Sequence, residues 1–368
     1  MNINIIGKFF DNQSLSIINR NLALALSSTA NSISITPLDT PNSMHKLPPE
    51  DVERLLSLDA PNNPDIEIRH SYPPIWNWPE SGSTKVVYIQ PWEFTSIPSE
   101  WQYKFDTFAD AVIVPSNWNA AVYRAAGIDP SKIHVVPNGY DELVFYPNQQ
   151  KNNTGIKFLY VGCAQFRKGI DVLLRVWSQV TKKQENIELI VKDTPQVYGQ
   201  NTLVQDVIKL QYKTGCAKIS YLDDTMSEQE MADLYRDCDF IVHPYRGEGF
   251  GMHIQEAMAC GCIPIVTAGG PTDEFADGYK IKSTRRVVNP YEIFALKQGD
   301  SMSNMGQHRW VLEPDAQDLA NLIRQAISEH KSKKIDTSRL TTWSKALDLY
   351  LHALDSVSAI ERPRRARQ

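Results

Sequence analysis

The chain has 368 residues, of which 42% are hydrophobic and 22% charged, and its formal net charge is -5 at pH 7. This length exceeds one ordinary hydrophobic core and suits two domains, while the composition is that of a soluble globular protein. A slightly negative chain has no general attraction to the phosphates of nucleic acid, so no nucleic-acid partner is expected.

The first residues and the cysteines indicate the compartment. Residues 1–7 alternate like a strand and lack the basic end and long apolar core of a signal peptide. No stretch approaches the ~18 apolar residues of a membrane span. The five cysteines form no second paired motif, which predicts reduced, mostly buried thiols rather than disulfides or a zinc site. We therefore expect a cytoplasmic protein.

A strand, a glycine and a helix open the chain. Residues 3–6 predict a buried strand, Gly7 follows in a loop, and the apolar residues from Ile17 to Leu26 predict a helix. A dinucleotide-binding loop has the pattern G-x-G-x-x-G, whereas Gly7 stands alone. This difference disfavours a nicotinamide-dependent oxidoreductase.

Further strands alternate with helices up to about residue 150. The predicted strands are residues 33–35, 66–68, 85–89, 111–114 and 133–136. Ser116 is a candidate N-cap of the helix that follows residues 111–114. Alternating strands and helices predict a parallel sheet covered on both faces.

Two polar and aromatic loops follow strands of this first half. One begins near His70, and the other contains Trp92 and Glu93. Because ligands of open α/β sheets bind beyond the carboxyl ends of the strands, both loops are candidate walls of a site. Structural packing explains the aromatic residues about as well.

A polar, glycine-ended segment, residues 147–155, marks the predicted domain boundary. A new strand at residues 158–161 then leads through Gly162 to Arg167 and Lys168 and into a helix. Cations at a strand-to-helix junction are well placed to bind a phosphate. Two solvated surface cations are the alternative interpretation.

The remaining elements extend to the end of the chain. We predict strands at 187–191 and 219–222, a capping box of Ser227 and Glu230, an insertion or mobile loop at about 277–305, and helices from about 314 and over 338–360. The basic tail, residues 361–368, is predicted to be disordered. Contact of this tail with an anionic membrane surface is one hypothesis, and a solvated tail is the favoured one.

The stretch from Glu248 to Glu256 combines loop glycines, a helix start and two carboxylates. Gly249 and Gly251 let the backbone approach a ligand, and the helix directs free N–H groups at the loop, which suits a phosphate. Glu256 lies about 7 Å along the helix axis at roughly 1.5 Å per residue, so two acceptors flank the anion site. A nucleotide sugar, with hydroxyls on both sides of a diphosphate, has the matching shape. The alternative interpretation is that Glu248 is a solvated loop residue and Glu256 lies on a solvent-exposed helix face.

The chain resembles the retaining glycosyltransferases of family 4, which have the GT-B fold of two Rossmann-like domains. The resemblance rests on the E-x7-E signature from Glu248 to Glu256, and on three further segments, residues 136–141, 160–169 and 235–261. It implies an α/β fold with an acceptor-side domain at 1–150 and a donor-side domain at 151–337. The helix at 338–360 is expected to cross back onto the first domain, followed by the tail at 361–368.

The resemblance also implies roles for individual residues. Glu248 would bind hydroxyls of the donor sugar, Glu256 the nucleotide ribose, and Lys168 with Arg167 the leaving phosphate. Donor-binding backbone is expected at Gly162, Gly249, Phe250, Gly251 and Met252. The chemistry would need no metal and no cofactor beyond the nucleotide-diphosphate sugar, and the anomeric configuration would be retained.

This chain departs from the family pattern at three places. Many members carry an arginine where this chain has Cys163, a histidine near Ile89, and a glycine-rich turn where Gly7 stands alone. The candidate acceptor-side residues are therefore Gly7, His70, Trp92 and Glu93. We predict a hexosyltransferase of polysaccharide biosynthesis that acts on a glycan, lipid-linked or other hydroxyl acceptor. The alternatives are a catalytically inactive sugar-nucleotide-binding protein and another GT-B enzyme, such as a sugar-nucleotide epimerase.

Overall fold

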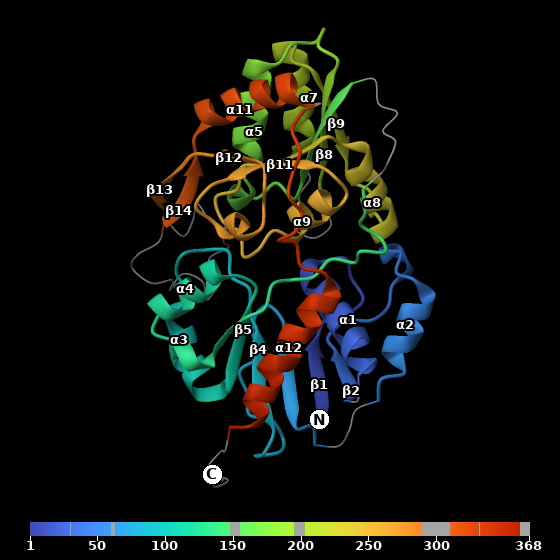
Figure 1. The fold of residues 1–368 in the computed structure, drawn as a ribbon, viewed down its shortest axis with the longest axis vertical. Helices are drawn as coiled ribbons and strands as arrows, with labels where there is room; N and C mark the ends of the chain where they lie inside the picture. The colour runs from blue at the N-terminus through green and yellow to red at the C-terminus, as the bar shows by residue number, and fades with distance from the viewer. Residues whose placement is uncertain are drawn as a thin grey trace.

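The computed structural model describes residues 1–29, 31–59, 63–147, 155–194, 203–288, 310–330 and 332–360. These residues form two lobes that meet along a waist (Figure 1). The N-lobe comprises residues 1–147 together with the last helix, α12 (Trp343–Ser358), and the C-lobe comprises the described residues from 155 to 342. Residues 148–154 of the predicted boundary segment, and the predicted disordered tail, residues 361–368, lie outside the described residues.

The N-lobe is built on a parallel sheet of six strands in the order β2-β1-β3-β4-β5-β6. The strands are β1 (Asn2–Gly7), β2 (Ser32–Pro37), β3 (Ile66–His70), β4 (Lys85–Ile89), β5 (Ala111–Val114) and β6 (Ile133–Val135). The helices are α1 (Ser14–Ser27), α2 (Pro49–Leu56), α3 (Ser99–Phe108) and α4 (Asn117–Ala125). The strand order reverses beside β1, and ligands of such sheets bind at this switch point, outside the carboxyl ends of the strands.

The C-lobe repeats this plan with the order β12-β11-β10-β7-β8-β9. The strands are β7 (Ile156–Val161), β8 (Ile187–Lys192), β9 (Lys218–Leu222), β10 (Phe240–His243), β11 (Ile263–Thr267) and β12 (Tyr279–Ile281). The helices are α5 (Ile170–Val180), α7 (Leu203–Thr214), α8 (Glu228–Asp237), α9 (Met252–Ala259) and α11 (Ala316–Glu329). A separate antiparallel pair, β13 (Ser283–Val287) and β14 (Trp310–Pro314), lies at the side of the lobe.

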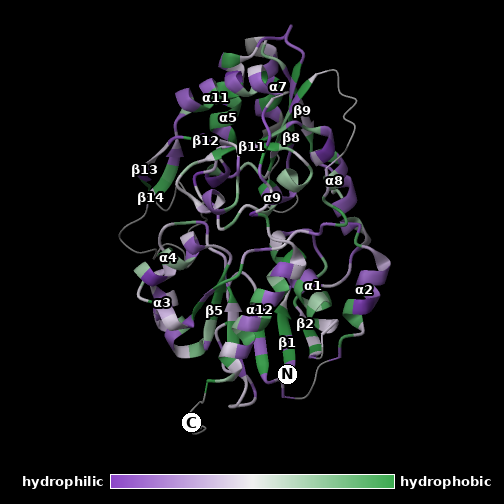
Figure 2. Cartoon of the chain, viewed as in Figure 1, coloured by the Kyte–Doolittle hydropathy of each residue, from purple (hydrophilic) through white to green (hydrophobic). Residues whose placement is uncertain are grey.

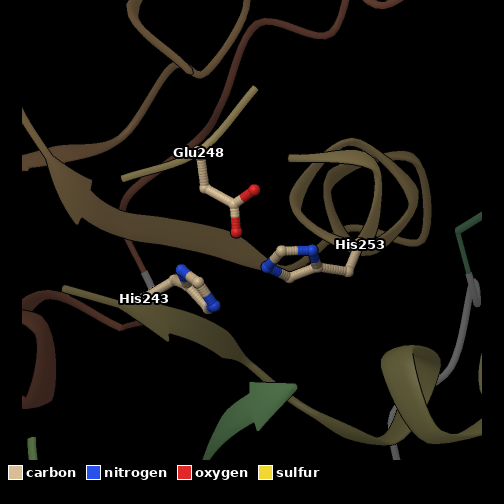
Figure 3. Close-up of side chains that lie close together, drawn as sticks. All are labelled: His243, Glu248 and His253. Atoms are coloured by element: carbon tan, nitrogen blue, oxygen red, sulfur yellow. The ribbon is translucent and has the colours of Figure 1, made fainter. Parts of the chain in front are cut away.

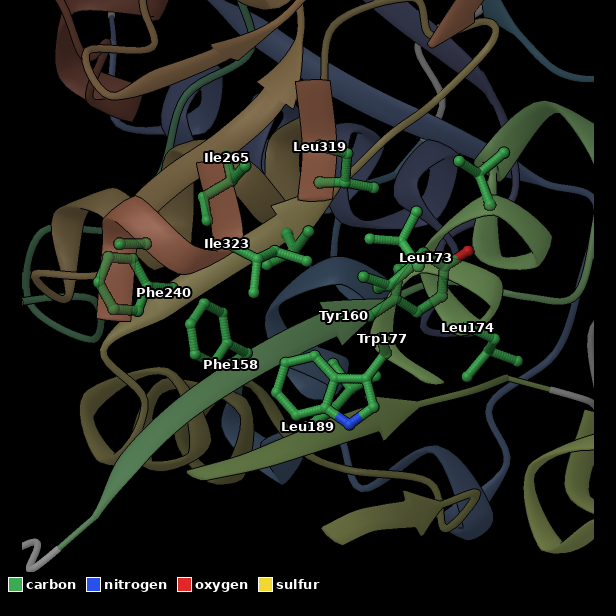
Figure 4. Packing of buried hydrophobic residues seen from close by; sticks show 14 of the residues in the cluster. Phe158, Tyr160, Leu173, Leu174, Trp177, Leu189, Phe240, Ile265, Leu319 and Ile323 are labelled. Carbon is green, nitrogen blue, oxygen red and sulfur yellow. The ribbon is translucent and has the colours of Figure 1, made fainter. Parts of the chain in front are cut away.

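Apolar strands and amphipathic helices explain both lobes. The strands are hydrophobic along much of their length, whereas the outer helices are hydrophilic on their exposed sides (Figure 2). In the C-lobe, Leu173 and Trp177 of α5 pack against Phe158 and Leu189 of the sheet, and Ile323 of α11 joins them (Figure 4). Burying a large apolar side chain contributes about 1.5–3 kcal/mol.

Several local predictions are confirmed. Ser116 caps α4 by accepting a hydrogen bond from the N–H of Asn119, and Ser227 with Glu230 forms the capping box of α8.

One prediction is partly wrong, because residues 279–281 and 283–287 form β12 and β13 rather than an irregular insertion. Tyr279 and Ile281 are buried in the C-lobe core, which a three-residue strand in a polar sequence does not reveal. The rest of that segment, residues 289–305, lies outside the described residues.

The last helix belongs to the lobe at the opposite end of the sequence. Residues of α12 are buried in the N-lobe core, and Figure 1 shows α12 lying across this lobe. The chain reaches it beside the linker, where the Tyr140 N–H donates to Thr341 O at 3.0 Å and the Trp343 N–H to Tyr140 O at 3.1 Å. Among the described residues, no helix combines the length and apolar character that a membrane span requires.

Replacement of Leu354 by alanine tests the role of α12. Leu354 is fully buried in the N-lobe core, so Leu354→Ala should lower the free energy of unfolding by about 2–5 kcal/mol. Urea denaturation measures this loss. Leu349 is 41% exposed on the same helix, and Leu349→Ala is the matched control. Equal losses in both variants would contradict the packing of α12 described above.

Candidate active site between the lobes

The site lies where β10 ends and α9 begins, facing the N-lobe. Gly251 occupies the N-cap position of α9 with φ 101°, a left-handed conformation that favours glycine. Gly249 has a different environment, because a Cβ there would lie 3.4 Å from the N–H nitrogen of Trp92 in the N-lobe. The glycines of this loop therefore serve the helix start and the close approach of the other lobe.

Glu248 is the centre of the charge arrangement. Its side chain is 8% exposed, it forms an ion pair with Lys168 Nζ, and its Oε1 lies 3.6 Å from Arg167 Nη1. Burial alone would raise the pKa of Glu248, but the Lys168 and Arg167 cations outweigh this effect and lower the pKa to about 2. Glu248 is therefore ionised at neutral pH.

A tight turn brings the two cations to Glu248. Arg167 and Lys168 end a short 3-10 helix, η3 (Phe166–Lys168), and Gly169 follows with φ 71°. A Cβ at Gly169 would clash with the carbonyl oxygen of Pro244, so the turn can pack on the end of β10 only with glycine at this position. The Arg246 N–H then donates to Arg167 O at 2.7 Å.

Arg246 anchors the loop that carries Glu248. Its guanidinium binds both carboxylate oxygens of Asp171 and both of Glu313, at 2.8 to 2.9 Å. Burial alone would lower the pKa of Arg246, but these hydrogen bonds to the two carboxylates raise it. Bidentate pairs of this kind fix orientation as well as charge.

Glu256 faces a separate cavity. Its Oε2 accepts a hydrogen bond from Tyr235 OH at 3.2 Å, and burial, with a contribution from Glu228, raises the pKa of Glu256 to about 7. Arg20 of the N-lobe lies 3.5 Å from Glu228. The cavity of about 80 Å³ is lined by both lobes, at Asn12, Ile17, Arg20, Asn21, Tyr140, Asp141, Phe145, Met226, Glu228, Met231, Glu256 and Trp343.

Two histidines that the sequence analysis missed lie beside Glu248. Figure 3 shows the Glu248 carboxylate directed toward the His243 and His253 rings, whose centroids are 4.4 Å apart. Burial lowers the pKa of His253 to about 3 and holds the pKa of His243 well below its usual value, so both rings are neutral. Their positions gave a signal, since His243 ends the strand before the E-x7-E stretch and His253 lies within that stretch, in the first turn of α9.

His243, Glu248 and His253 have the spacing of a metal centre. One ligand atom each from His243, Glu248 and His253 lies within 4.8 Å of the others. However, Glu248 is already paired with Lys168 and Arg167, and a divalent ion there would lie beside two fixed positive charges. The charges at this place suit side-chain cations that face an anionic ligand better than they suit a bound metal ion.

His70 and Gly7 form a packed unit at the switch point of the N-lobe. His70 is fully buried and its Nδ1 lies 2.8 Å from Asn19 Oδ1. Because Asn19 Nδ2 donates to Lys8 O and His70 O, the Asn19 oxygen accepts and the proton is on His70 Nδ1. A Cβ at Gly7 would clash with Asn19. Burial lowers the pKa of His70 to about 3, so the ring is neutral.

The loop after β4 requires a correction. Trp92 was expected to form a wall on the acceptor side, but its side chain is 2% exposed, packs against Trp101 and donates from its indole nitrogen to Ser96 O. It is a residue of the N-lobe core. Glu93, the other acceptor-side candidate of this loop, has its Oε1 3.2 Å from Arg167 Nη2 of the C-lobe.

The other expected donor residues line the same region. Gly162 directly follows β7 and has φ 151°, and a Cβ there would lie 3.6 Å from His243 Nε2. The Phe250 ring packs on Phe275 at 4.9 Å, and Met252 is buried, so both side chains belong to the core. Only their backbone N–H groups, at the start of α9, can face an anion.

Two family models match neighbouring parts of the chain. The model "Glycosyltransferase Family 4" matches residues 55–142 and the model "Glycosyl transferases group 1" matches residues 145–299. In solved structures, HepE of Anabaena in complex with UDP-glucose aligns with a TM-score of 0.66 at 14% identity, over 98% of this chain and 100% of that one. Sucrose-phosphate synthase of Thermosynechococcus elongatus aligns with a TM-score of 0.57 at 16% identity, over 98% and 94%.

Curated relatives match part of the chain. A D-inositol 3-phosphate glycosyltransferase of Xylanimonas cellulosilytica is 28% identical over 44% of this chain and 40% of its own length. That of Mycobacterium bovis is 27% identical over 61% and 51%. The chain thus spans about half or less of the length of these relatives. The structural matches confirm the predicted GT-B fold. Both family models that match the chain are models of glycosyltransferases, one within the N-lobe and the other mainly in the C-lobe, as the sequence resemblance predicted.

The raised pKa of Glu256 predicts a pH-dependent stability. Its folded pKa of about 7 exceeds the ordinary value near 4.3, so its contribution is fully present below about pH 4 and is lost as the pH rises through 7. Glu256→Gln stays neutral, so its free energy of unfolding should rise relative to the wild type between pH 5 and 8, by up to about 3 kcal/mol.

Urea denaturation at a series of pH values measures this difference. The control is Glu53→Gln, which changes an exposed carboxylate on α2. A difference between Glu256→Gln and wild type that stays constant with pH would contradict the raised pKa.

Proposed function

We propose that this protein is a retaining, metal-independent glycosyltransferase that moves a hexosyl group from a nucleotide-diphosphate sugar to a hydroxyl acceptor. The observation that carries the proposal is the pairing of buried Glu248 with Lys168 and Arg167 at the start of α9, between the lobes. A paired carboxylate can accept from sugar hydroxyls while the cations face the diphosphate.

The chemistry follows from this charge arrangement. The bond between the anomeric carbon and the diphosphate oxygen breaks, and negative charge develops on the leaving diphosphate. Lys168, Arg167 and the N-terminus of α9 stabilise that charge without reorganising, which is a large effect in a site shielded from water. The acceptor hydroxyl forms the new bond on the same face of the sugar and gives its proton to the departing phosphate oxygen.

The relatives suggest the first substrates to examine. HepE of Anabaena was crystallised with UDP-glucose, and several curated relatives are named as D-inositol 3-phosphate glycosyltransferases. We therefore propose UDP-hexoses as the first donors. For the acceptor we propose a glycan or lipid-linked hydroxyl in polysaccharide biosynthesis, with the protein acting in the cytoplasm. Contact of the basic tail with an anionic membrane surface is a further proposal, and the tail lies outside the described residues.

Two other functions make different predictions. A catalytically inactive sugar-nucleotide-binding protein would bind donor and never release nucleotide. A sugar-nucleotide epimerase would interconvert donors in the absence of an acceptor. The presence of both glutamates together with Lys168 favours transfer over simple binding.

A donor panel tests the proposal. The protein is incubated with UDP-, GDP- and ADP-hexoses with and without acceptors, and mass spectrometry follows nucleotide release and product. We expect one donor class to release nucleotide, and Glu248→Gln to lower transfer by about 10²–10³-fold. NMR of the product should show the anomeric configuration of the donor. Absence of turnover with every donor, or full activity of Glu248→Gln, would contradict the proposal.

Metal removal is a separate test. Since the cationic side chains supply the positive charge, the transfer rate in excess EDTA should stay within about twofold of the rate with Mg²⁺ or Mn²⁺. Initial rates with the active donor measure this. A large loss in EDTA that Mn²⁺ restores would assign His243, Glu248 and His253 to a metal instead.

A further inference from the structure

The loop Gln90–Glu93 of the N-lobe lies directly on the glycine loop of the C-lobe. A Cβ at Gly247 would clash with the carbonyl oxygen of Glu93, and one at Gly249 would lie 3.4 Å from Pro91 Cβ. Ser116, the N-cap of α4, donates from its hydroxyl to Gly249 O at 3.0 Å. The two loops therefore meet backbone to backbone in this arrangement of the lobes.

The backbone that carries Glu93 is held firmly by the N-lobe. Asn119 Oδ1 accepts from the Trp92 N–H at 2.8 Å, and Asn119 Nδ2 donates to Trp92 O at 2.7 Å. Tyr123 OH donates to Gln90 O at 2.9 Å. With the Trp92 ring in the core, the position of Glu93 follows the N-lobe as a rigid part.

Arg167 lies between carboxylates of the two lobes. Its backbone oxygen is bound by the C-lobe N–H groups of Arg246 and Gly247. Its guanidinium has Glu248 Oε1 at 3.6 Å and Glu93 Oε1 at 3.2 Å, and the Arg167 side chain is 13% exposed. One of these partners comes from its own lobe and the other comes from across the cleft.

We propose that Glu93 is a positioning residue of the donor site, which holds Arg167 beside Glu248 when the lobes are together. This inference rests on the proposed function. In the described part of the chain, the second carboxylate beside Arg167 is that of Glu93 in the N-lobe, so lobe closure completes the charge arrangement that faces the leaving diphosphate. Closure that assembles a catalytic arrangement is an established way to link substrate binding to chemistry.

The positioning role of Glu93 predicts opposite effects on catalysis and on diphosphate binding. Glu93 is an anion near the phosphate-facing cations, so its removal raises the local positive potential and does not weaken diphosphate binding. Removal does release the guanidinium, which then no longer meets the developing charge in a fixed position. Transfer slows while ground-state affinity is kept or improved. A loss of folded structure would weaken both.

Four proteins test the proposal: wild type, Glu93→Gln, Arg167→Gln and the double variant. For Glu93→Gln we expect kcat to fall roughly tenfold, with the donor KM and the UDP dissociation constant unchanged or lower. The double variant should be no slower than Arg167→Gln, because Glu93 acts through Arg167. Donor hydrolysis without acceptor should fall in parallel with transfer, which separates this role from an acceptor-side role.

Glu100→Gln is the matched control, since Glu100 is 44% exposed on α3 of the same lobe and pairs only along its own helix with Lys104 among the contacts described. Wild-type kcat in Glu93→Gln, weaker UDP binding, or additive losses in the double variant would each overturn the proposal. If Glu93→Gln does not fold, Glu93→Asp replaces it with the same expected direction. Wild type and Glu100→Gln inactive with every donor would instead refute the proposed function, and UDP binding by calorimetry would still test Glu93.

Discussion

The structure of the site depends on one buried carboxylate held between two cations. Glu248 is taken out of water, and the nearby Lys168 and Arg167 keep it charged. That arrangement in turn requires the tight turn at Gly169 and the anchoring of Arg246 by carboxylates on two other elements. The burial of the Glu248 carboxylate thus accounts for the residues found at Gly169 and Arg246, which lie in separate segments of the C-lobe.

Much of this could be predicted from short-range sequence patterns. Strand periodicity located the parallel sheets, and Ser116 and Ser227 were found as caps, because both signals depend on residues within a turn of one another. The proximity of Lys168 to Glu248 was also foreseeable, since carboxyl ends of parallel strands meet at one edge. β12 was missed because a three-residue strand carries too little pattern to detect.

The rest could not be predicted because it depends on how the lobes pack. Nothing local distinguishes Glu93, which pairs across the cleft, from Trp92, which turns into the core. The glycines show the same limit. Their spacing suggested close approach of a ligand, whereas Gly247 and Gly249 also admit the backbone of the opposite lobe. A glycine in a sequence therefore indicates that another group approaches the backbone closely, but it does not identify that group.

The crossing of α12 has a consequence for the order in which the protein can mature. Tyr350, Leu354 and Val357 complete the core of the N-lobe, yet they are synthesised after the whole C-lobe. On the ribosome, the first lobe therefore keeps an apolar face uncovered until α12 has emerged. Such exposed surface is what chaperones bind and what drives aggregation. Truncation near the C-terminus would damage the lobe made first.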